Sequence, residues 1–375
     1  MPDLYDAVAA GMWAYSNAAF RVEVLGPRRL ALRPGTVILV THRRETDVPV
    51  ICPPLYHRAG MRRNHAIRMS FAARDDMFLP GFFAGFPPEL PRRARRLLYR
   101  VGVARWLPVV RVHPIRSASV ARLGEVLRAR PAAPLAELVP AETAAAFRAR
   151  AAESRLPPPT RAGDVLRGDY ADLLWRGVSP GDGVVDGLEE FWGRRATQAA
   201  ADFRALVAIL RAPGVLVVFP EGRPSPDGEI GPVRPGIGAL LRRGRPAAVQ
   251  PLALAYDPLV HGRTRVFVAL PDAVEPPTED VEAALLHLLR RSLPLTCGQF
   301  VAHRLAGGAE ADAEALRRAL AEEVEESRAA GRPVEPALLS PEGRARRLAE
   351  ALAVAPVKPR ALAFLAREYA SARDL

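Results

Sequence analysis

The sequence predicts an α/β protein with a mixed central sheet flanked by helices, a helical insertion and a helical C-terminal region. Three observations support this fold class. Short apolar runs typical of buried strands, such as TVILV at 36–40 and GVLVVFP at 214–220, are separated by segments with a helical pattern. Residues 114–197 are dominated instead by Ala and Arg, with breaks at Pro and Gly. From about residue 279 the pattern is helical and charged.

The elements are expected in a simple order along the chain. A helix over residues 4–20 comes first, and an amphipathic helix over 198–211 follows the insertion. Strands are expected at 22–26, 36–40, 65–71, 107–114, 214–220, 248–256 and 263–270. We therefore expect one domain over 1–275 that contains the insertion at about 114–197, and a helical region over 276–375 with breaks near 331–341 and 355–359.

The composition indicates an anionic partner. The 375 residues carry 53 basic and 41 acidic side chains, a net charge of +12, and Lys358 is the only lysine. Such a balance suits phosphate, a lipid surface or nucleic acid. No nucleic-acid-binding motif is present and arginine is spread along the chain, so a nucleic-acid partner is not expected. The two cysteines, Cys52 and Cys297, suggest neither a disulfide framework nor a metal site.

Any contact with a membrane is expected to be peripheral, on the cytoplasmic face. The chain opens with MPDLYD, which lacks the positive charge of a signal peptide, and no apolar run approaches ~20 residues. Two segments suit a membrane surface: helix 4–20, with Trp13 and Tyr15, and the Phe-rich stretch 78–86. The latter is followed by Arg92, Arg93, Arg95, Arg96 and Arg100. The alternative for both segments is packing on the protein core, which the pattern favours for helix 4–20 because a helix with one apolar side and little charge is typical of a surface helix docked on the core.

The segment THRRETDVPV at 41–50 contains the first candidate for chemistry. His42 and Asp47 are five positions apart, so in a regular helix or strand they would face different sides. They can meet only if His42 ends the strand 36–40 and Asp47 lies past a turn. Asp47 would then fix the tautomer of His42, whose other ring nitrogen would act as a general base. Alternatively, Asp47 only caps a helix that begins before Pro49.

Two further segments end in residues that can bind an anion or a hydroxyl. In FPEGRPSPDGEIGPVRPG, from Phe219, Glu221 can bind hydroxyls while Arg223 and Arg234 hold anionic oxygens. Arg111 closes PVVR at 108–111 and is a candidate phosphate ligand. The alternatives are an ordinary surface loop and an ordinary surface arginine.

The order of these segments, followed by VQPL at 249–252, resembles the four sequence blocks of the glycerolipid acyltransferases, which include glycerol-3-phosphate and 1-acylglycerol-3-phosphate acyltransferases. The resemblance covers about residues 20–112 and 200–272. It implies that His42 and Asp47 are catalytic, and that an acceptor hydroxyl attacks the thioester of acyl-CoA or acyl carrier protein in phospholipid synthesis. It implies no acyl-enzyme, no metal and no further cofactor. Arg111, Glu221, Gly222 and Arg223 would bind a glycerol phosphate or lysophosphatidate acceptor at an anionic membrane surface.

The chain departs from the family pattern at several positions. Thr41 precedes the histidine, and Arg43 and Arg44 follow it. Pro224 stands where the family has its phosphate-binding arginine, so either Arg223 compensates or the acceptor carries no phosphate. Acyl transfer to another lipid alcohol or to a lysophospholipid, and a non-catalytic lipid-binding protein of the same fold, therefore remain open alternatives.

Overall fold

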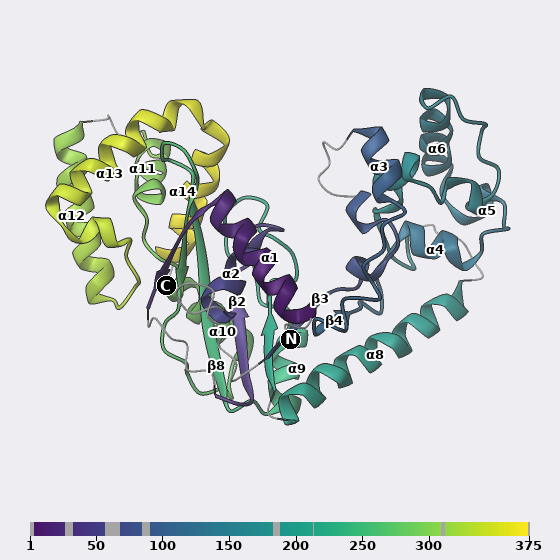
Figure 1. Ribbon diagram of the computed structural model, residues 1–375, viewed down its shortest axis with the longest axis horizontal. Coiled ribbons are helices and arrows are strands. Elements are labelled where there is room, and N and C mark those ends of the chain that lie inside the picture. Colours follow the sequence, from purple (N-terminus) through teal and green to yellow (C-terminus); the bar gives the residue numbers. More distant parts are fainter. Residues whose placement is uncertain are drawn as a thin grey trace. The chain divides into compact units, whose positions relative to one another are not determined.

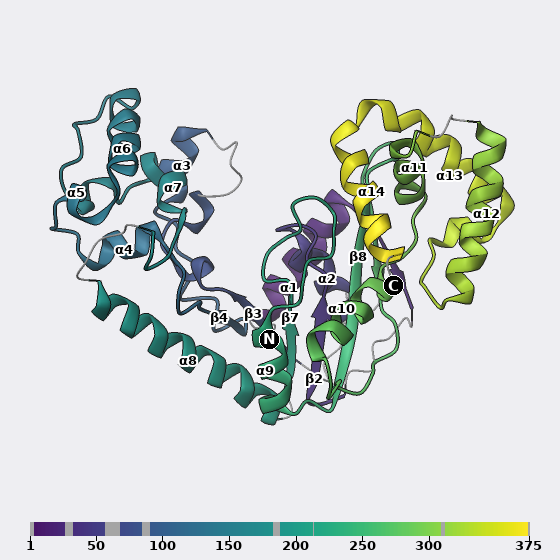
Figure 2. The same cartoon turned by 180° about the vertical axis from the view of Figure 1, so that it is seen from behind.

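The structure is a computed structural model that describes residues 4–26, 33–56, 68–84, 91–182, 188–212, 214–308 and 312–373. The chain forms two compact units (Figures 1 and 2). Unit 1 comprises Met1–Phe71 and Val207–Leu375, and unit 2 comprises Ala72–Leu206. The expected insertion at 114–197 thus lies inside unit 2, while the expected C-terminal region 276–375 belongs to unit 1.

A seven-stranded, mostly parallel sheet forms the centre of the fold, in the order β1-β9-β8-β2-β7-β3-β4. Strand β2 pairs in parallel with β7 on one side and with β8 on the other. Among the strand pairings of this sheet whose register the structure describes, only that of β8 with β9 is antiparallel. The predicted α/β class with a mixed sheet is therefore confirmed. The strands are β1 (Arg21–Leu25), β2 (Thr36–Val40), β3 (Met69–Arg74), β4 (Val112–Ile115), β7 (Val215–Val218), β8 (Ala248–Asp257) and β9 (Arg265–Ala269).

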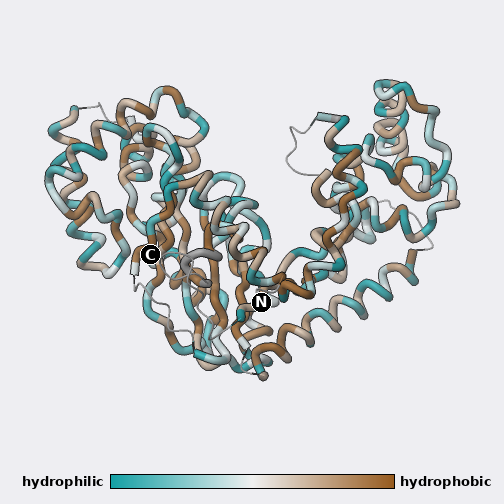
Figure 3. The backbone as a smooth tube through the Cα atoms, in the orientation of Figure 1, coloured by the Kyte–Doolittle hydropathy of each residue, from teal (hydrophilic) through white to brown (hydrophobic). Residues whose placement is uncertain are grey.

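The apolar runs form the most buried strands. All five residues of β2 and all ten of β8 are buried, which explains why these strands read as continuous apolar runs and not as alternating patterns. Their register runs from Thr36 opposite Ala248 to Val40 opposite Leu252. Figure 3 shows hydrophobic residues running along the central strands of unit 1. This register brings the carboxyl ends of β2, β7 and the middle of β8 to the same edge of the sheet.

Helices cover the sheet of unit 1 and form its C-terminal part. Helix α1 packs against α2, α10 packs against β8, and α11 packs against α14. In Figure 1, α11 to α14 gather beside one end of β8. Helices α13 and α14 each begin at a proline, which agrees with the expected breaks near 331–341 and 355–359. The helices of unit 1 are α1 (Leu4–Ala19), α2 (Asp47–Tyr56), α9 (Pro235–Gly244), α10 (Val281–Ser292), α11 (Cys297–Ala306), α12 (Ala313–Ala329), α13 (Pro341–Val354) and α14 (Pro359–Arg373).

Unit 2 is mainly helical and has its own core, formed by buried residues such as Val126, Leu138, Phe147 and Tyr170. The buried side chain of Arg195 ties its segments together through ion pairs. The elements are α3 (Arg92–Leu98), α4 (Leu123–Ala129), α5 (Leu135–Leu138), α6 (Ala141–Glu153) and α7 (Ala171–Leu174), with the short antiparallel pair β5 (Ala121–Arg122) and β6 (Gly177–Val178). Helix α8 (Glu189–Arg211) leads from unit 2 into unit 1.

The expected strand 107–114 is largely wrong. Residues 103–111 form successive turns, in which Val110 donates to the carbonyl of Trp106 and Arg111 to that of Pro108, and the strand begins only at Val112. Arg111 has a φ of 57°, a left-handed conformation that no strand contains. The alternation of Val, Pro and Arg looked like a strand because it has no helical period. Part of the other expected strand, 65–71, lies outside the described residues, and β3 begins at Met69.

No helix in the described part of the chain is both long and apolar enough to cross a membrane.

Candidate active site

His42 lies just beyond the carboxyl end of β2, in a segment that is fastened to β8. The backbone N–H of Thr41 donates to the carbonyl of Leu252 over 3.1 Å, and the Thr41 hydroxyl accepts a hydrogen bond from the N–H of Leu254 over 2.9 Å. Thr41 is fully buried. The threonine that departs from the family pattern therefore prolongs the pairing of β2 with β8 and fixes the backbone from which His42 projects.

His42 and Asp47 form the predicted pair. Nδ1 of His42 lies 2.9 Å from Oδ2 of Asp47, whose side chain is fully buried at the first position of α2. The same Oδ2 accepts hydrogen bonds from the backbone N–H groups of Arg43, over 2.6 Å, and Arg44, over 2.9 Å. The five-residue spacing works because the intervening loop curls around the carboxylate.

Tyr256, at the end of β8, completes the surroundings of Asp47. Its hydroxyl donates to Oδ1 of Asp47 over 2.8 Å, and the guanidinium of Arg44 lies 4.4 Å from the centre of its ring. Burial, and next the charge of Asp47, raise the pKa of Tyr256, which keeps the phenol protonated as a donor. The sequence analysis missed Tyr256; its only signal was its position four residues after VQPL at 249–252.

The hydrogen bonds determine the tautomer of His42. A carboxylate only accepts hydrogen bonds, so Nδ1 must carry the proton that points at Asp47. Nε2 then presents its lone pair, and no described residue provides a hydrogen bond to it. The ring lies 4.4 Å from the ring of Phe219, and the His42 side chain keeps 12% of its surface exposed. The arrangement suits a general base whose reactive nitrogen is reached from solvent.

Glu221, at the exit of β7, contacts the backbone of the histidine. Its Oε1 accepts the N–H of His42 over 2.7 Å, and its Oε2 accepts the N–H of Gly231 over 3.0 Å. Only 4% of the residue is exposed. Burial raises the pKa of Glu221, while the nearby charge of Arg43 and the two backbone donors oppose this. The contacts give Glu221 a role in holding the His42 segment, and binding of an acceptor hydroxyl stays a prediction.

Gly222 and Arg223 form the turn that follows. Gly222 has a φ of +72°, a conformation that favours glycine, and its N–H donates to the carbonyl of Phe219 over 3.0 Å. Arg223 is exposed and makes neither a hydrogen bond nor an ion pair within the described part of the chain. Nε of Arg234 donates to the carbonyl of Glu221 over 3.2 Å. The structure thus leaves Arg223 available to an anion, and its contact with an acceptor stays a prediction.

Arg111 lies in unit 2, whereas the other predicted site residues lie in unit 1. Binding of the acceptor by Arg111, together with the site residues of unit 1, stays a prediction.

Arg43, next to the histidine, is among the most buried side chains of the protein, at 2% exposure. Its Nη1 donates to the carbonyl of Gly228 over 2.9 Å, and its Nη2 lies 3.6 Å from Oε1 of Glu221. On the other side, its Nε lies 3.8 Å from Oε1 of Glu368 in α14. Glu368 is fully buried, accepts from Nε2 of Gln299 over 2.7 Å, and burial raises its pKa to about 7. This second departure from the family pattern thus links the histidine segment to the C-terminal helices.

The segment 219–234 also packs directly on α14. The N–H of Ile230 donates to the Ser371 hydroxyl over 3.0 Å. Gly228, with a φ of +100°, lies so close to the helix that an added Cβ would stand 2.1 Å from the carbonyl oxygen of Phe364. The expected helical C-terminal region is therefore part of the scaffold that holds the candidate site. Sequence reasoning could not find this, because α14 lies outside the resemblance.

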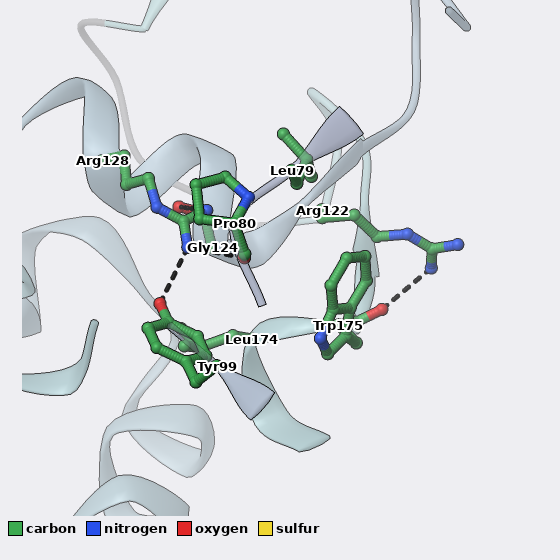
Figure 4. A pocket seen from close by; sticks show the side chains of 8 residues that line it. All are labelled: Leu79, Pro80, Tyr99, Arg122, Gly124, Arg128, Leu174 and Trp175. Atoms are coloured by element: carbon green, nitrogen blue, oxygen red, sulfur yellow. Dashed lines mark hydrogen bonds between the residues drawn. The ribbon is translucent and has the colours of Figure 1, made fainter. Parts of the chain in front are cut away.

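A cavity in unit 2 lies beside Tyr99, Arg122, Arg128 and Trp175 (Figure 4). Arg128 donates to the Tyr99 hydroxyl over 2.7 Å, and Arg122 donates to the carbonyl of Trp175 over 2.8 Å. The cavity measures about 10 Å³, which is the space of a single water molecule. It is therefore too small for a substrate.

The candidate site brings together His42, the buried carboxylate of Asp47 that its Nδ1 contacts, and the backbone around Gly222. Within the described ranges, no group of three or more His, Cys, Asp or Glu side chains is arranged to hold a metal ion. No protein-family model matches the chain, and no curated protein matches it at a significant level.

Proposed function

We propose that the protein transfers an acyl group from a thioester donor to the hydroxyl of a lipid or lipid precursor. The observation that supports this best is the pair formed by His42 and the fully buried Asp47, which leaves Nε2 of His42 with no hydrogen-bond partner among the described residues. Asp47 receives three further donors, from Arg43, Arg44 and Tyr256, so its position is rigidly defined. A protein that only binds lipid has no need of such a base.

The proposed reaction needs no nucleophilic side chain. Nε2 of His42 takes the proton of the acceptor hydroxyl as its oxygen bonds to the thioester carbonyl carbon. The C–S bond then breaks, and the leaving thiolate takes the proton back from His42. Asp47 stabilises the imidazolium that forms in between. A general base of this kind is typically worth ~10²–10⁴ in rate.

The proposed acceptor is a glycerol phosphate or a lysophosphatidate. Arg223 supports this choice, because it is exposed, charged and two positions from Glu221, which holds the His42 backbone. Pro224 favours the alternative of an uncharged lipid alcohol, since proline offers no cation to a phosphate at the position where the family pattern has an arginine. The two acceptors are distinguished by Arg223→Ala, which should raise KM only for a phosphorylated acceptor.

The proposed partner surface is an anionic membrane, contacted through unit 2. Helix α3 and the turns after it expose Leu97, Val101, Trp106 and Val109, of which Leu97 is 70% exposed. The exposed Arg93 and Arg100 lie in the same segment. In the Phe-rich stretch 78–86, Phe82 packs edge-on against both Phe83 and Trp175. Phe86 lies outside the described residues.

The decisive experiment is a transfer assay with purified protein, labelled acyl-CoA or acyl carrier protein, and a panel of glycerol phosphate, lysophosphatidate, lysophospholipids and uncharged lipid alcohols. We expect an ester product from one acceptor, and at least a ~10²-fold lower rate for His42→Ala. His287→Ala, which removes an exposed histidine of α10, is the matched control and should leave the rate unchanged. Wild-type turnover by His42→Ala with verified product would refute the proposed mechanism.

A further inference from the structure

A cavity of about 270 Å³ lies in unit 1, and six of the nine residues that line it are basic. Its walls come from β1, the loop between β8 and β9, the start of β9, the 3₁₀ turn Pro336–Leu339 and α13. Val260 and Ala337 are the only apolar residues in its lining, and Glu350 is the only acidic one. The basic residues of the lining are Arg21, His261, Arg263, Arg265, Arg346 and Arg347.

Two of these arginines are buried and fixed by ion pairs. Arg265 bonds Glu23 and Glu335, and Arg347 bonds Glu335, Asp257 and Glu350. Each uses three N–H groups in these bonds, and a guanidinium has five. Both therefore have N–H groups that these bonds do not use, while the ion pairs fix the orientation of each guanidinium group.

The remaining arginines are exposed and largely uncompensated. Arg21 lies 3.4 Å from Glu23, which it shares with Arg265. Arg263 donates to the neutral backbone carbonyl of Asn17. Arg346 has no hydrogen bond or ion pair among the residues that the structure describes. The positive charges of Arg263 and Arg346 thus have no carboxylate partner among the described residues, at a cavity that the fixed guanidinium groups of Arg265 and Arg347 also line.

The cavity lies on a different face of the sheet from the candidate active site. Tyr256 and Asp257 are successive residues of β8, and successive side chains of a strand point to opposite faces. Tyr256 contacts Asp47, beside His42, whereas Asp257 contacts Arg347 of the cavity. The basic cavity is therefore a separate feature, and an inference about it does not depend on the proposed acyl transfer.

We propose that this cavity binds the phosphate group of a small, polar phosphomonoester. A phosphate dianion matches the two uncompensated guanidinium groups in charge, and planar guanidinium donors match its oxygens in geometry. The volume exceeds that of a single phosphate, so a polar organic group fits beside it. Only two of the nine lining residues are apolar, so the cavity suits a polar group better than the acyl chain of a lipid, although a lipid headgroup carries the same chemistry.

The test is isothermal titration calorimetry of the full chain at low ionic strength with inorganic phosphate, glucose 6-phosphate and, as an uncharged match, glucose. We expect the two phosphates to bind and glucose not to bind. The double variant Arg263→Gln/Arg346→Gln should weaken phosphate binding by at least about tenfold, because charge-assisted hydrogen bonds are lost. Since both side chains are exposed, this variant should unfold at the wild-type temperature.

Two controls carry the same type of charge change. Arg317→Gln/Arg318→Gln removes two exposed arginines of α12 and should bind like the wild type. Arg148→Gln/Arg155→Gln removes two exposed arginines of unit 2, outside the lining of the cavity, and should also bind like the wild type. A second experiment measures how much of the protein sediments with phosphatidylcholine vesicles that contain or lack phosphatidate. If the wild type binds only vesicles with phosphatidate, and Arg263→Gln/Arg346→Gln does not bind them, then a lipid headgroup is the source of the phosphate. The proposal fails if no probe binds, or if the cavity variant and the controls behave alike.

Discussion

The hydroxyl of Tyr256 donates a 2.8 Å hydrogen bond to Oδ1 of Asp47, the oxygen that His42 does not contact. Asp47 is fully buried, and its other oxygen receives His42 and two backbone N–H groups. Tyr256, at the end of β8, therefore supplies the hydrogen-bond donor for the carboxylate oxygen of Asp47 that the His42 segment does not contact. A hydrogen bond to a charged group contributes about 1.5–3 kcal/mol, so this contact matters for the position of Asp47.

Tyr256→Phe is expected to lower kcat by about tenfold while leaving both KM values nearly unchanged, because Tyr256 positions Asp47 and not the substrates. The loss should be much smaller than that of His42→Ala. Tyr5→Phe is the matched control, since the buried Tyr5 hydroxyl donates to the backbone carbonyl of Met69 instead. Steady-state kinetics of the three variants test this. A kcat for Tyr256→Phe equal to that of Tyr5→Phe would contradict the positioning role.

The sequence contained enough information to predict the sheet and the pair of His42 and Asp47. Buried parallel strands leave continuous apolar runs, and the end of such a run is where a side chain can project over the edge of the sheet. The same local signals failed at 107–114, because turns that contain Val and Pro imitate a strand. What the pattern could not reveal was the left-handed conformation of Arg111.

The contacts that hold the site depend on distant parts of the chain and could not be predicted from local pattern. Arg43 looked like a departure from the family, yet its burial becomes understandable only with Glu368, which is 325 positions later and lies 3.8 Å away. Similarly, the sequence predicts that Glu221 binds the acceptor, but it gives no sign that the two oxygens of Glu221 accept backbone N–H groups of His42 and Gly231. The residue types at these positions predicted charged and hydrogen-bonding side chains, but tertiary packing determines which residues they contact.

Glu368 should make stability depend on pH. Burial raises its pKa to about 7 in the folded protein, above the ordinary value of 4.5, while Arg43, Gln299, Arg44 and Arg332 favour the charged form. Between these two pH values the folded protein binds more protons than the unfolded chain. The contribution of this group to stability is therefore fully present below pH 4.5 and is lost as the pH rises through about 7. The shift corresponds to a loss on the order of 3 kcal/mol.

Glu368→Gln tests this, because the amide resembles the protonated acid and does not titrate. Urea unfolding at each pH gives the free energy of unfolding of the variant and of the wild type. The variant should become more stable relative to the wild type as the pH rises from 4.5 to 8, because only the wild type loses the contribution of Glu368. Glu350→Gln is a useful comparison, since hydrogen bonds to the His261 backbone and to Arg347 lower the pKa of Glu350. The contribution of Glu350 to stability is lost only as the pH falls below 4.5, so the difference for Glu350→Gln should stay nearly constant from pH 4.5 to 8. A difference for Glu368→Gln that stays constant across this range would show that Glu368 is ionised throughout.

Membrane binding through unit 2 should depend on both charge and exposed apolar surface. Arg96 and Arg95 pair with Asp169 and Asp172, so the better test is Arg93→Gln/Arg100→Gln, which changes exposed side chains. This variant should sediment less with anionic vesicles, and added salt should weaken wild-type binding in the same way, since each exposed charge near the surface contributes about 1 kcal/mol.

The matched control for this surface is Arg148→Gln/Arg155→Gln, which removes two exposed arginines elsewhere in unit 2. Its sedimentation should match that of the wild type. Leu97→Ser/Trp106→Ser should reduce binding at high salt as well, because these exposed side chains contribute apolar contact. If all of these variants bind the vesicles equally well, then the protein does not contact the membrane through α3.

Gly228 provides a test of whether α14 supports the candidate site. Alanine at this position would place its Cβ 2.1 Å from the backbone oxygen of Phe364, so either α14 or the segment 219–234 must move, and a φ of +100° adds strain. Because this segment contains Glu221, which holds the backbone of His42, both stability and transfer should fall. Gly228→Ala should lower the free energy of unfolding by more than about 2 kcal/mol.

Gly262→Ala separates the clash from the backbone strain. Gly262 also has a positive φ, +82°, but nothing lies within 4 Å of an added Cβ. It should therefore lose only about 1 kcal/mol, the penalty for a left-handed residue other than glycine, and keep its transfer rate. Chemical unfolding and the acyl-transfer assay of both variants decide the matter. If Gly228→Ala is no less stable than Gly262→Ala and equally active, then the packing of α14 on the segment 219–234 does not support the position of His42.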